Sequence, residues 1–112
     1  MSSKAKAAVA EARKIVIIND PMRSHTQNFD CSGFVQYCYK KVGVNIPRTT
    51  YEQINCGKAV SRKELKIGDL VFPNPGLVGL YTGNGKMIHV PKTGNVIKES
   101  NILTFYTARR VA

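Results

Sequence analysis

The sequence predicts an α+β domain in which N-terminal helices pack on one face of a small antiparallel β-sheet. Apolar residues recur at helical spacing in two segments before residue 45, and short β-rich runs separated by turn residues begin at residue 69. The chain of 112 residues, with a mass of 12.4 kDa, has room for one hydrophobic core. Residues 1–112 are therefore predicted to form a single domain.

The two predicted helices differ in how clearly their ends are marked. In the first, apolar residues repeat three and four positions apart from Ala5 to Val16, and the sequence Asn19-Asp20-Pro21 is expected to stop it. In the second, Phe34 and Cys38 begin an i, i+4 stripe, Asp30 is a suitable N-cap and Gly43 a suitable C-terminal cap. Cys31 should therefore lie on the first turn of the second helix.

The predicted strands follow one another as a meander. They are expected at Leu70–Phe72, Val78–Thr82, Met87–Val90 and Val96–Lys98, with turns at Gly83-Asn84-Gly85 and Lys92-Thr93-Gly94-Asn95.

The register of the middle hairpin decides which residues share a face of the sheet. A two-residue Asn84-Gly85 turn would pair Leu80 with His89 and leave Leu77 and His89 on opposite faces. A three-residue loop that includes Gly83 would instead pair Gly79 with His89 and make Leu77 a diagonal neighbour on the same face. We favour the three-residue loop, because a glycine opposite His89 leaves room for the imidazole.

The charge balance favours an anionic partner. The chain has 17 Lys and Arg residues against 7 Asp and Glu, a net charge of +10. Such a surface attracts nucleic acid, acidic lipid headgroups or the anionic polymers of a bacterial wall, although it also suits a merely soluble protein. The basic residues are scattered and no aromatic-basic ladder for stacking bases is visible, so nucleic acid is the least favoured of these partners.

The N-terminal sequence does not predict a signal peptide or a membrane span. Lys4 and Lys6 resemble the start of a leader, but Glu11 and Arg13 interrupt the apolar stretch, and residues 15–18 are too short to cross a bilayer. We expect a soluble chain that acts at the bacterial cell wall, exported by another route or cut from a longer secreted protein.

The three cysteines predict neither a disulfide framework nor a zinc site, and no cofactor or metal is expected. Cys38 lies in the apolar helical stripe and Cys56 in a loop, so both are interpreted as structural. Cys31 is different, because a helix N-terminus stabilises a thiolate and its free N–H groups can help to form an oxyanion hole. The neighbouring Asp30 carboxylate opposes that effect, and a small buried residue at the start of a core helix is the alternative interpretation.

Three blocks of the sequence resemble a known family: FDCSGFVQYCYKKVGVNIPRTTYEQINCGKAV, LKIGDLVF and VGLYTGNGKMIHVPKTG. Over residues 28–100 they are similar to the NlpC family of papain-like cell-wall cysteine endopeptidases. The resemblance implies a papain-like fold, a nucleophilic Cys31, and cleavage of peptidoglycan stem peptides, usually next to a D-glutamyl residue. It also implies that Asp30 and Ser32 help to hold the amino end of the substrate.

One position departs from the family pattern. The resemblance implies a general-base histidine where this chain has Leu77, and a third polar residue, which orients that base, at His89. Leucine cannot accept a proton, and loss of a general base lowers turnover by about 10²–10⁴-fold. His89 itself could have a catalytic or a merely structural role, and His25 could fold back towards Cys31 as a substitute base or be an exposed loop histidine.

Two functional classes follow. The chain is either a γ-D-glutamyl stem-peptide endopeptidase, weakened or inactive at Leu77, or a non-catalytic homologue that binds wall peptides or a protein partner. The sequence leaves open the oligomeric state, the exact bond cleaved and whether Leu77 is natural.

Overall fold

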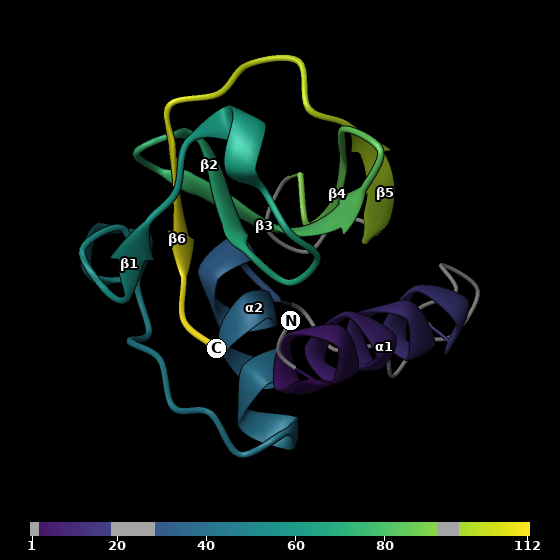
Figure 1. The fold of residues 1–112 in the computed structure, drawn as a ribbon. Helices are drawn as coiled ribbons and strands as arrows, with labels where there is room; N and C mark the ends of the chain where they lie inside the picture. The colour runs from purple at the N-terminus through teal and green to yellow at the C-terminus, as the bar shows by residue number, and fades with distance from the viewer. Residues whose placement is uncertain (1–2, 19–28, 92–96) are drawn as a thin grey trace.

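The computed structural model describes residues 3–18, 29–91 and 97–112. The elements in chain order are α1 (Ser3–Ile18), α2 (Cys31–Lys41), α3 (Thr50–Gln53), β1 (Lys58–Ala59), the 3-10 helix η1 (Arg62–Glu64), β2 (Leu70–Asn74), β3 (Leu77–Gly83), β4 (Lys86–His89), β5 (Lys98–Asn101) and β6 (Thr107–Arg110). The strands form one antiparallel sheet in the order β1-β6-β2-β3-β4-β5, and α1 and α2 pack against each other and against β3 (Figure 1). The predicted α+β class is confirmed.

Both predicted helices are present. In α1 the alanines expected on the apolar face are buried, while the predicted stop at Asn19-Asp20-Pro21 lies outside the described residues. In α2 the N-cap is Asp30, whose carboxylate accepts a hydrogen bond of 2.7 Å from the Gly33 N–H. Gly43 follows the end of α2 with a φ of +84°, the left-handed conformation that glycine adopts without strain.

The predicted meander corresponds to β2, β3, β4 and β5, with one shift, and the strands β1 and β6 were not predicted. The last strand of the meander spans Lys98–Asn101, two residues beyond the predicted start at Val96, which is outside the described part of the chain. The longer of the two strands that were not predicted is β6, which pairs antiparallel with β2 from Leu70–Arg109 to Phe72–Thr107 and has the two-residue β1 on its other edge. Its sequence, Thr-Ala-Arg-Arg, lacks the alternating apolar pattern on which the strand prediction relied.

The hairpin between β3 and β4 has the predicted register but reaches it by a different turn. Gly79 pairs with His89, as expected from a three-residue loop. The connection is in fact the two-residue turn Asn84-Gly85, in which both residues have positive φ, and Gly83 pairs with Lys86. A bulge between Tyr81 and Gly83 adds one residue to β3 and shifts the register by one. The three-residue loop was therefore wrong, because the bulge and not the turn sets the pairing.

The two faces of the sheet contact different parts of the structure. Leu70, Phe72, Val78, Leu80 and Ile88 lie in the main core with the buried residues of α1 and α2. The opposite face carries a smaller apolar cluster built on Val71, Met87 and Ile102. The helices thus cover one face, and the other is left for a binding pocket.

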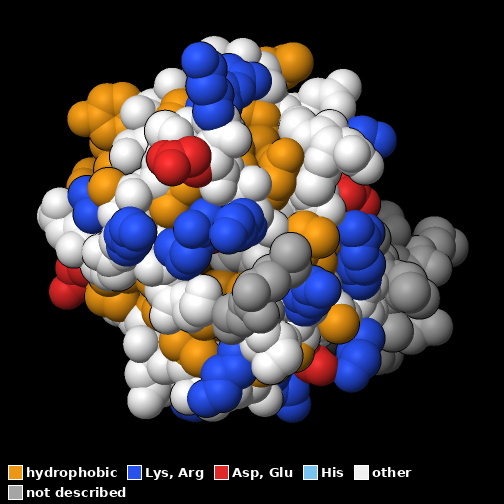
Figure 2. Space-filling view, viewed as in Figure 1, with side chains coloured by type: hydrophobic (Ala, Val, Ile, Leu, Met, Phe, Trp, Pro, Cys, Tyr) orange, Lys and Arg blue, Asp and Glu red, His pale blue; other side chains and the backbone are white. Residues whose placement is uncertain are grey.

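The visible surface is basic, as predicted from the composition. Figure 2 shows Lys and Arg side chains spread over this face among fewer acidic ones, without a single concentrated arm. Among the described residues, no helix is both long enough and apolar enough to cross a bilayer.

One buried ion pair ties the start of β2 to β6. The Asp69 side chain is almost fully buried and accepts hydrogen bonds from Arg110 Nε at 2.9 Å and Nη2 at 2.8 Å. Asp69 Oδ2 also accepts the Lys66 N–H at 2.9 Å, and Arg110 Nη2 donates to the Glu64 carbonyl. Removing the guanidinium would leave a buried carboxylate without its counter-charge.

We expect Arg110→Met to lower the free energy of unfolding by about 3 kcal/mol, because breaking a buried pair on one side strands the other charge. Urea unfolding followed by circular dichroism measures the change. Arg13→Met is the matched control: its ion pair with Glu99 is partly exposed, so the loss should stay below about 1 kcal/mol. Equal losses in the two variants would contradict a special role for the buried pair.

Candidate active site

Cys31 occupies the first position of α2 and is partly exposed. Its thiol donates a long hydrogen bond, 3.8 Å, to the carbonyl of Gly76, the residue before Leu77. The thiol therefore lies where the N-terminus of α2 meets the start of β3. The free backbone N–H groups of a helix N-terminus are of the kind that can stabilise a developing oxyanion.

The other two cysteines are placed as structural residues. Cys38 is fully buried in the main core, and burial raises the pKa of its thiol to about 12. Burial also raises the pKa of Cys56, with a smaller opposing effect from the charge of Arg109. Neither group is suited to act as a thiolate nucleophile near neutral pH.

Asp30 and Ser32 are joined by a residue that the sequence reasoning missed, Arg48. Its guanidinium lies 3.0 Å from both Asp30 carboxylate oxygens and donates to Ser32 Oγ at 3.1 Å. Burial raises the pKa of the Asp30 carboxyl, but the hydrogen bonds from Arg48 and from the Gly33 N–H outweigh it, so the net pKa is lowered. Asp30 is therefore held as a carboxylate. The signal available in the sequence was an arginine inside the first family-like block.

Gln53 fixes the position of this group. Its side chain is fully buried, and Nε2 donates to the Ser32 carbonyl at 3.0 Å and to the Pro47 carbonyl at 2.7 Å. These two bonds fasten the first turn of α2 to the segment that carries Arg48. The carboxylate of Asp30 and the hydroxyl of Ser32 are thus held in fixed positions next to Cys31 in the chain.

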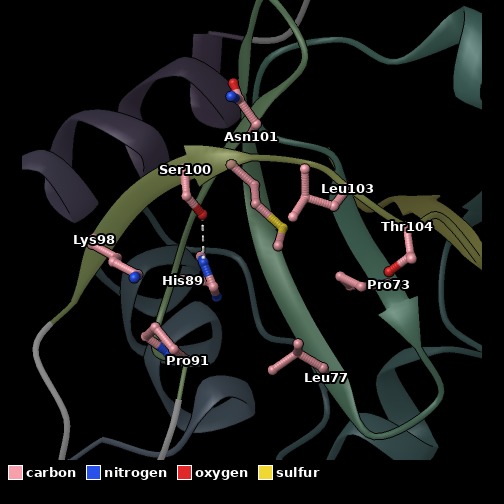
Figure 3. A pocket seen from close by; sticks show the side chains of 10 residues that line it. Pro73, Leu77, His89, Pro91, Lys98, Ser100, Asn101, Leu103 and Thr104 are labelled. Atoms are coloured by element: carbon pink, nitrogen blue, oxygen red, sulfur yellow. Dashed lines mark hydrogen bonds between the residues drawn. The ribbon is translucent and has the colours of Figure 1, made fainter.

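Leu77 and His89 line one pocket of about 470 Å³ on the face of the sheet opposite the helices (Figure 3). Leu77 extends from the start of β3 and His89 from the end of β4, as the Gly79–His89 pairing requires. A Cβ placed on Gly79 would lie 3.0 Å from His89 Cβ and 3.0 Å from the Ile88 carbonyl oxygen. Any side chain at position 79 would be in tight contact with these atoms, so glycine fits opposite His89 without a shift of its neighbours.

His89 is only 7% exposed, and one of its two ring nitrogens has a hydrogen-bond partner. Its Nε2 lies 2.8 Å from Ser100 Oγ, whereas its buried Nδ1 has no hydrogen-bond partner among the described residues. Burial lowers the pKa of His89, and the positive charge of Lys98 lowers it further. The imidazole is thus neutral near pH 7, and Leu77 offers it no polar partner.

The structure brings together some of the predicted site residues. Asp30, Cys31 and Ser32 lie on one helical turn, and Leu77 and His89 share the pocket, with the Gly76 carbonyl linking the thiol to the start of β3. Cys31 itself is not among the pocket-lining residues. His25, the candidate substitute base, lies outside the described residues.

A helix-borne thiol beside an antiparallel sheet, with a histidine on a central hairpin, is the arrangement of a papain-like cysteine peptidase. The NlpC/P60 family model matches residues 22–112, and the chain belongs to that family. The γ-D-glutamyl-L-lysine dipeptidyl-peptidase of Bacillus subtilis is 46% identical over 77 residues, which cover 62% of this chain and 26% of that protein. The chain spans less than half the length of several other curated relatives as well.

Two solved structures are similar over nearly the whole chain. The NlpC/P60 domain of the peptidoglycan hydrolase SagA has a TM-score of 0.79 and 34% identity, covering 95% of this chain and 97% of that domain. RipD of Mycobacterium tuberculosis, described as a non-catalytic NlpC/P60 domain adapted to peptidoglycan binding, has a TM-score of 0.76 and 25% identity with full coverage of both chains. The family thus includes hydrolases and a binding protein on one fold.

The lowered pKa of His89 predicts how stability depends on pH. Below its ordinary value of 6.5, the unfolded chain binds a proton that the folded chain resists. The free energy of unfolding should therefore fall as the pH drops through about 6.5 towards the folded-state pKa, and His89→Gln should reduce this slope. Urea unfolding at a series of pH values tests this, and an NMR titration midpoint for His89 at or above 6.5 would contradict it.

Proposed function

We propose that this chain is a peptidoglycan stem-peptide domain of the γ-D-glutamyl cysteine endopeptidase type whose hydrolysis is weakened or lost because Leu77 occupies the position of the general base. The observation that carries the proposal is that His89 Nδ1 is buried without a hydrogen-bond partner among the described residues, in the pocket that Leu77 lines. A histidine at position 77 would be a diagonal neighbour of His89 across the hairpin, within reach of that nitrogen. Leucine there leaves the thiol and the orienting imidazole without the group that would connect them.

The remaining parts of the site support recognition of the peptide. Asp30 is kept ionised by Arg48, and Ser32 Oγ is held by the same guanidinium, beside the Cys31 thiol. The carboxylate and hydroxyl oxygens held at this position can accept hydrogen bonds from the free amino end of a stem peptide. These contacts do not involve Leu77, so binding is expected to survive the loss of the base.

The basic surface is suited to bind a second partner, an anionic polymer. A net charge of +10 spread over the surface attracts the anionic polymers of a bacterial wall and raises the local concentration of wall peptides. The proposed place of action is the cell wall, where the named peptidoglycan hydrolases among the relatives find their substrate.

Restoring the base tests the proposal. Leu77→His is expected to raise the rate of cleavage of a γ-D-glutamyl stem peptide by about 10²–10⁴-fold over the unaltered chain, since a positioned general base contributes that much. Adding Cys31→Ala to Leu77→His should abolish the gain, because the nucleophile is then missing. Cleavage is measured by chromatography of the released peptides.

Two further variants separate the alternatives. Leu77→Gln controls for polarity without a base and should remain as slow as the unaltered chain. Rapid cleavage by the unaltered chain that disappears in His25→Ala would refute the proposal and identify His25 as a substitute base. Failure of Leu77→His to cleave, although it folds and binds the peptide, would show that more than the base has been lost.

A non-catalytic binding function is the second candidate, and the full-length similarity to RipD favours it. We expect Cys31→Ala to bind the stem peptide as tightly as the unaltered chain, because the thiol is not part of the Asp30–Arg48–Ser32 group. Asp30→Asn should weaken binding by about tenfold, because a charge-assisted hydrogen bond to the amino end is lost. Isothermal titration calorimetry measures both, and equal affinity of Asp30→Asn would argue against this group as the binding site.

A further inference from the structure

The described wall of the pocket on the open face of the sheet has one charged residue. Of the ten described residues that line it, Lys98 is the only Lys, Arg, Asp or Glu. Most of the remaining wall is apolar and comes from Pro73, Leu77, Met87 and Leu103. A pocket of this composition favours a ligand group that carries a negative charge next to aliphatic carbon.

The ammonium of Lys98 is directed to this pocket by the sheet register. Lys98 pairs with His89 across β4 and β5, so both side chains lie on the same face, and Figure 3 shows them side by side. Burial lowers the pKa of His89, and the nearby positive charge of Lys98 lowers it further, in keeping with this placement. Within the described ranges of the chain, the hydrogen bonds and ion pairs do not include Lys98.

The neighbouring residue on β5, Glu99, differs from Lys98 in having hydrogen-bond partners for its charged group. Glu99 points to the opposite face, where its carboxylate accepts hydrogen bonds from Arg13 at 2.8 Å and from Thr82 at 2.6 Å. The one acidic group of β5 is therefore bonded to residues of α1 and β3 and does not pair with Lys98. The Lys98 side chain is available to bind a ligand.

The polar neighbours of Lys98 reinforce this preference. Ser100 Oγ is engaged with His89 Nε2, and His89 is neutral, so neither supplies a negative charge that would attract an amine. By contrast, the Asp30–Arg48–Ser32 group at the N-terminus of α2 includes a carboxylate. Among the described residues, the wall of the Lys98 pocket has none, so this pocket favours an anionic ligand group.

We propose that this pocket is a carboxylate-selective subsite for the stem peptide, in which Lys98 distinguishes a free carboxylate from its carboxamide and the apolar wall holds the adjoining aliphatic chain. The inference rests on the proposed function, because it assigns the ligand of the same domain. The ligand of the pocket is a peptide and not a phosphate polymer. A polyanion would bind to the exposed basic surface and would make no use of the apolar wall.

The experiment compares two synthetic stem peptides that differ only in one group, a free carboxylate in the first and a carboxamide in the second. We expect the unaltered chain to bind the acid about three- to tenfold more tightly than the amide, as for a partly exposed charge pair. Lys98→Gln should bind both peptides equally, and Lys98→Glu should prefer the amide. Lys58→Gln, which removes an exposed lysine from β1 at the other edge of the sheet, should keep the preference of the unaltered chain.

NMR signals of the Met87 methyl group and the His89 ring report whether the peptide enters the pocket. Tight peptide binding with no change in these signals, or with an undiminished acid preference in Lys98→Gln, would overturn the subsite and leave the proposed function standing. Binding of neither peptide by the unaltered chain would overturn both. An acid preference lost equally in Lys98→Gln and Lys58→Gln would show a general effect of net charge and refute the assignment to Lys98.

Discussion

The pairing of Gly79 with His89 is the constraint on which the rest of the site depends. A one-residue bulge in β3 produces this register, and a one-residue slip would move every side chain of β4 to the other face of the sheet. With the bulge, Leu77 and His89 share one face with Lys98, and the intervening glycine leaves room for the imidazole. The same alternation sends Val78, Leu80 and Ile88 into the core against the helices, so the pocket and the core are set by a single register.

The site is assembled from parts that are held independently. Arg48 and Gln53 secure the first turn of α2, Ser100 secures His89, and the thiol contacts the Gly76 carbonyl. The Leu77 side chain takes part in none of these hydrogen bonds, so they do not depend on which residue occupies position 77. This independence is what the proposed loss of the base, with peptide binding retained, requires. It also makes the unpaired Nδ1 of His89 a local feature, not a sign of a collapsed site.

Sequence reasoning succeeded where a local signal was strong. The cap at Asp30, the stripe begun by Phe34 and the β-rich runs after residue 69 gave the second helix and four of the strands close to their observed positions. It failed at β6, whose Arg110 and Arg109 do not look like a buried strand, because the strand is stabilised by pairing with β2 and by the distant carboxylate of Asp69. It also missed Arg48, since the link from a loop to Asp30 and Ser32 is a contact between segments 16 and 18 residues apart.

The sequence by itself determined the fold class, the place of Cys31 at a helix N-terminus and the family resemblance, from which the expected loss of the base at Leu77 follows, because each depends on residue type and local spacing. Only the tertiary structure decided how the hairpin reached its register, which residue holds Asp30 and Ser32, and that Lys98 is the charged group of the pocket. The physical reason is that a bulge, an interloop ion pair and a shared sheet face arise from contacts between segments. Such contacts are selected by the packing of the whole domain and leave no periodic signal in any one segment.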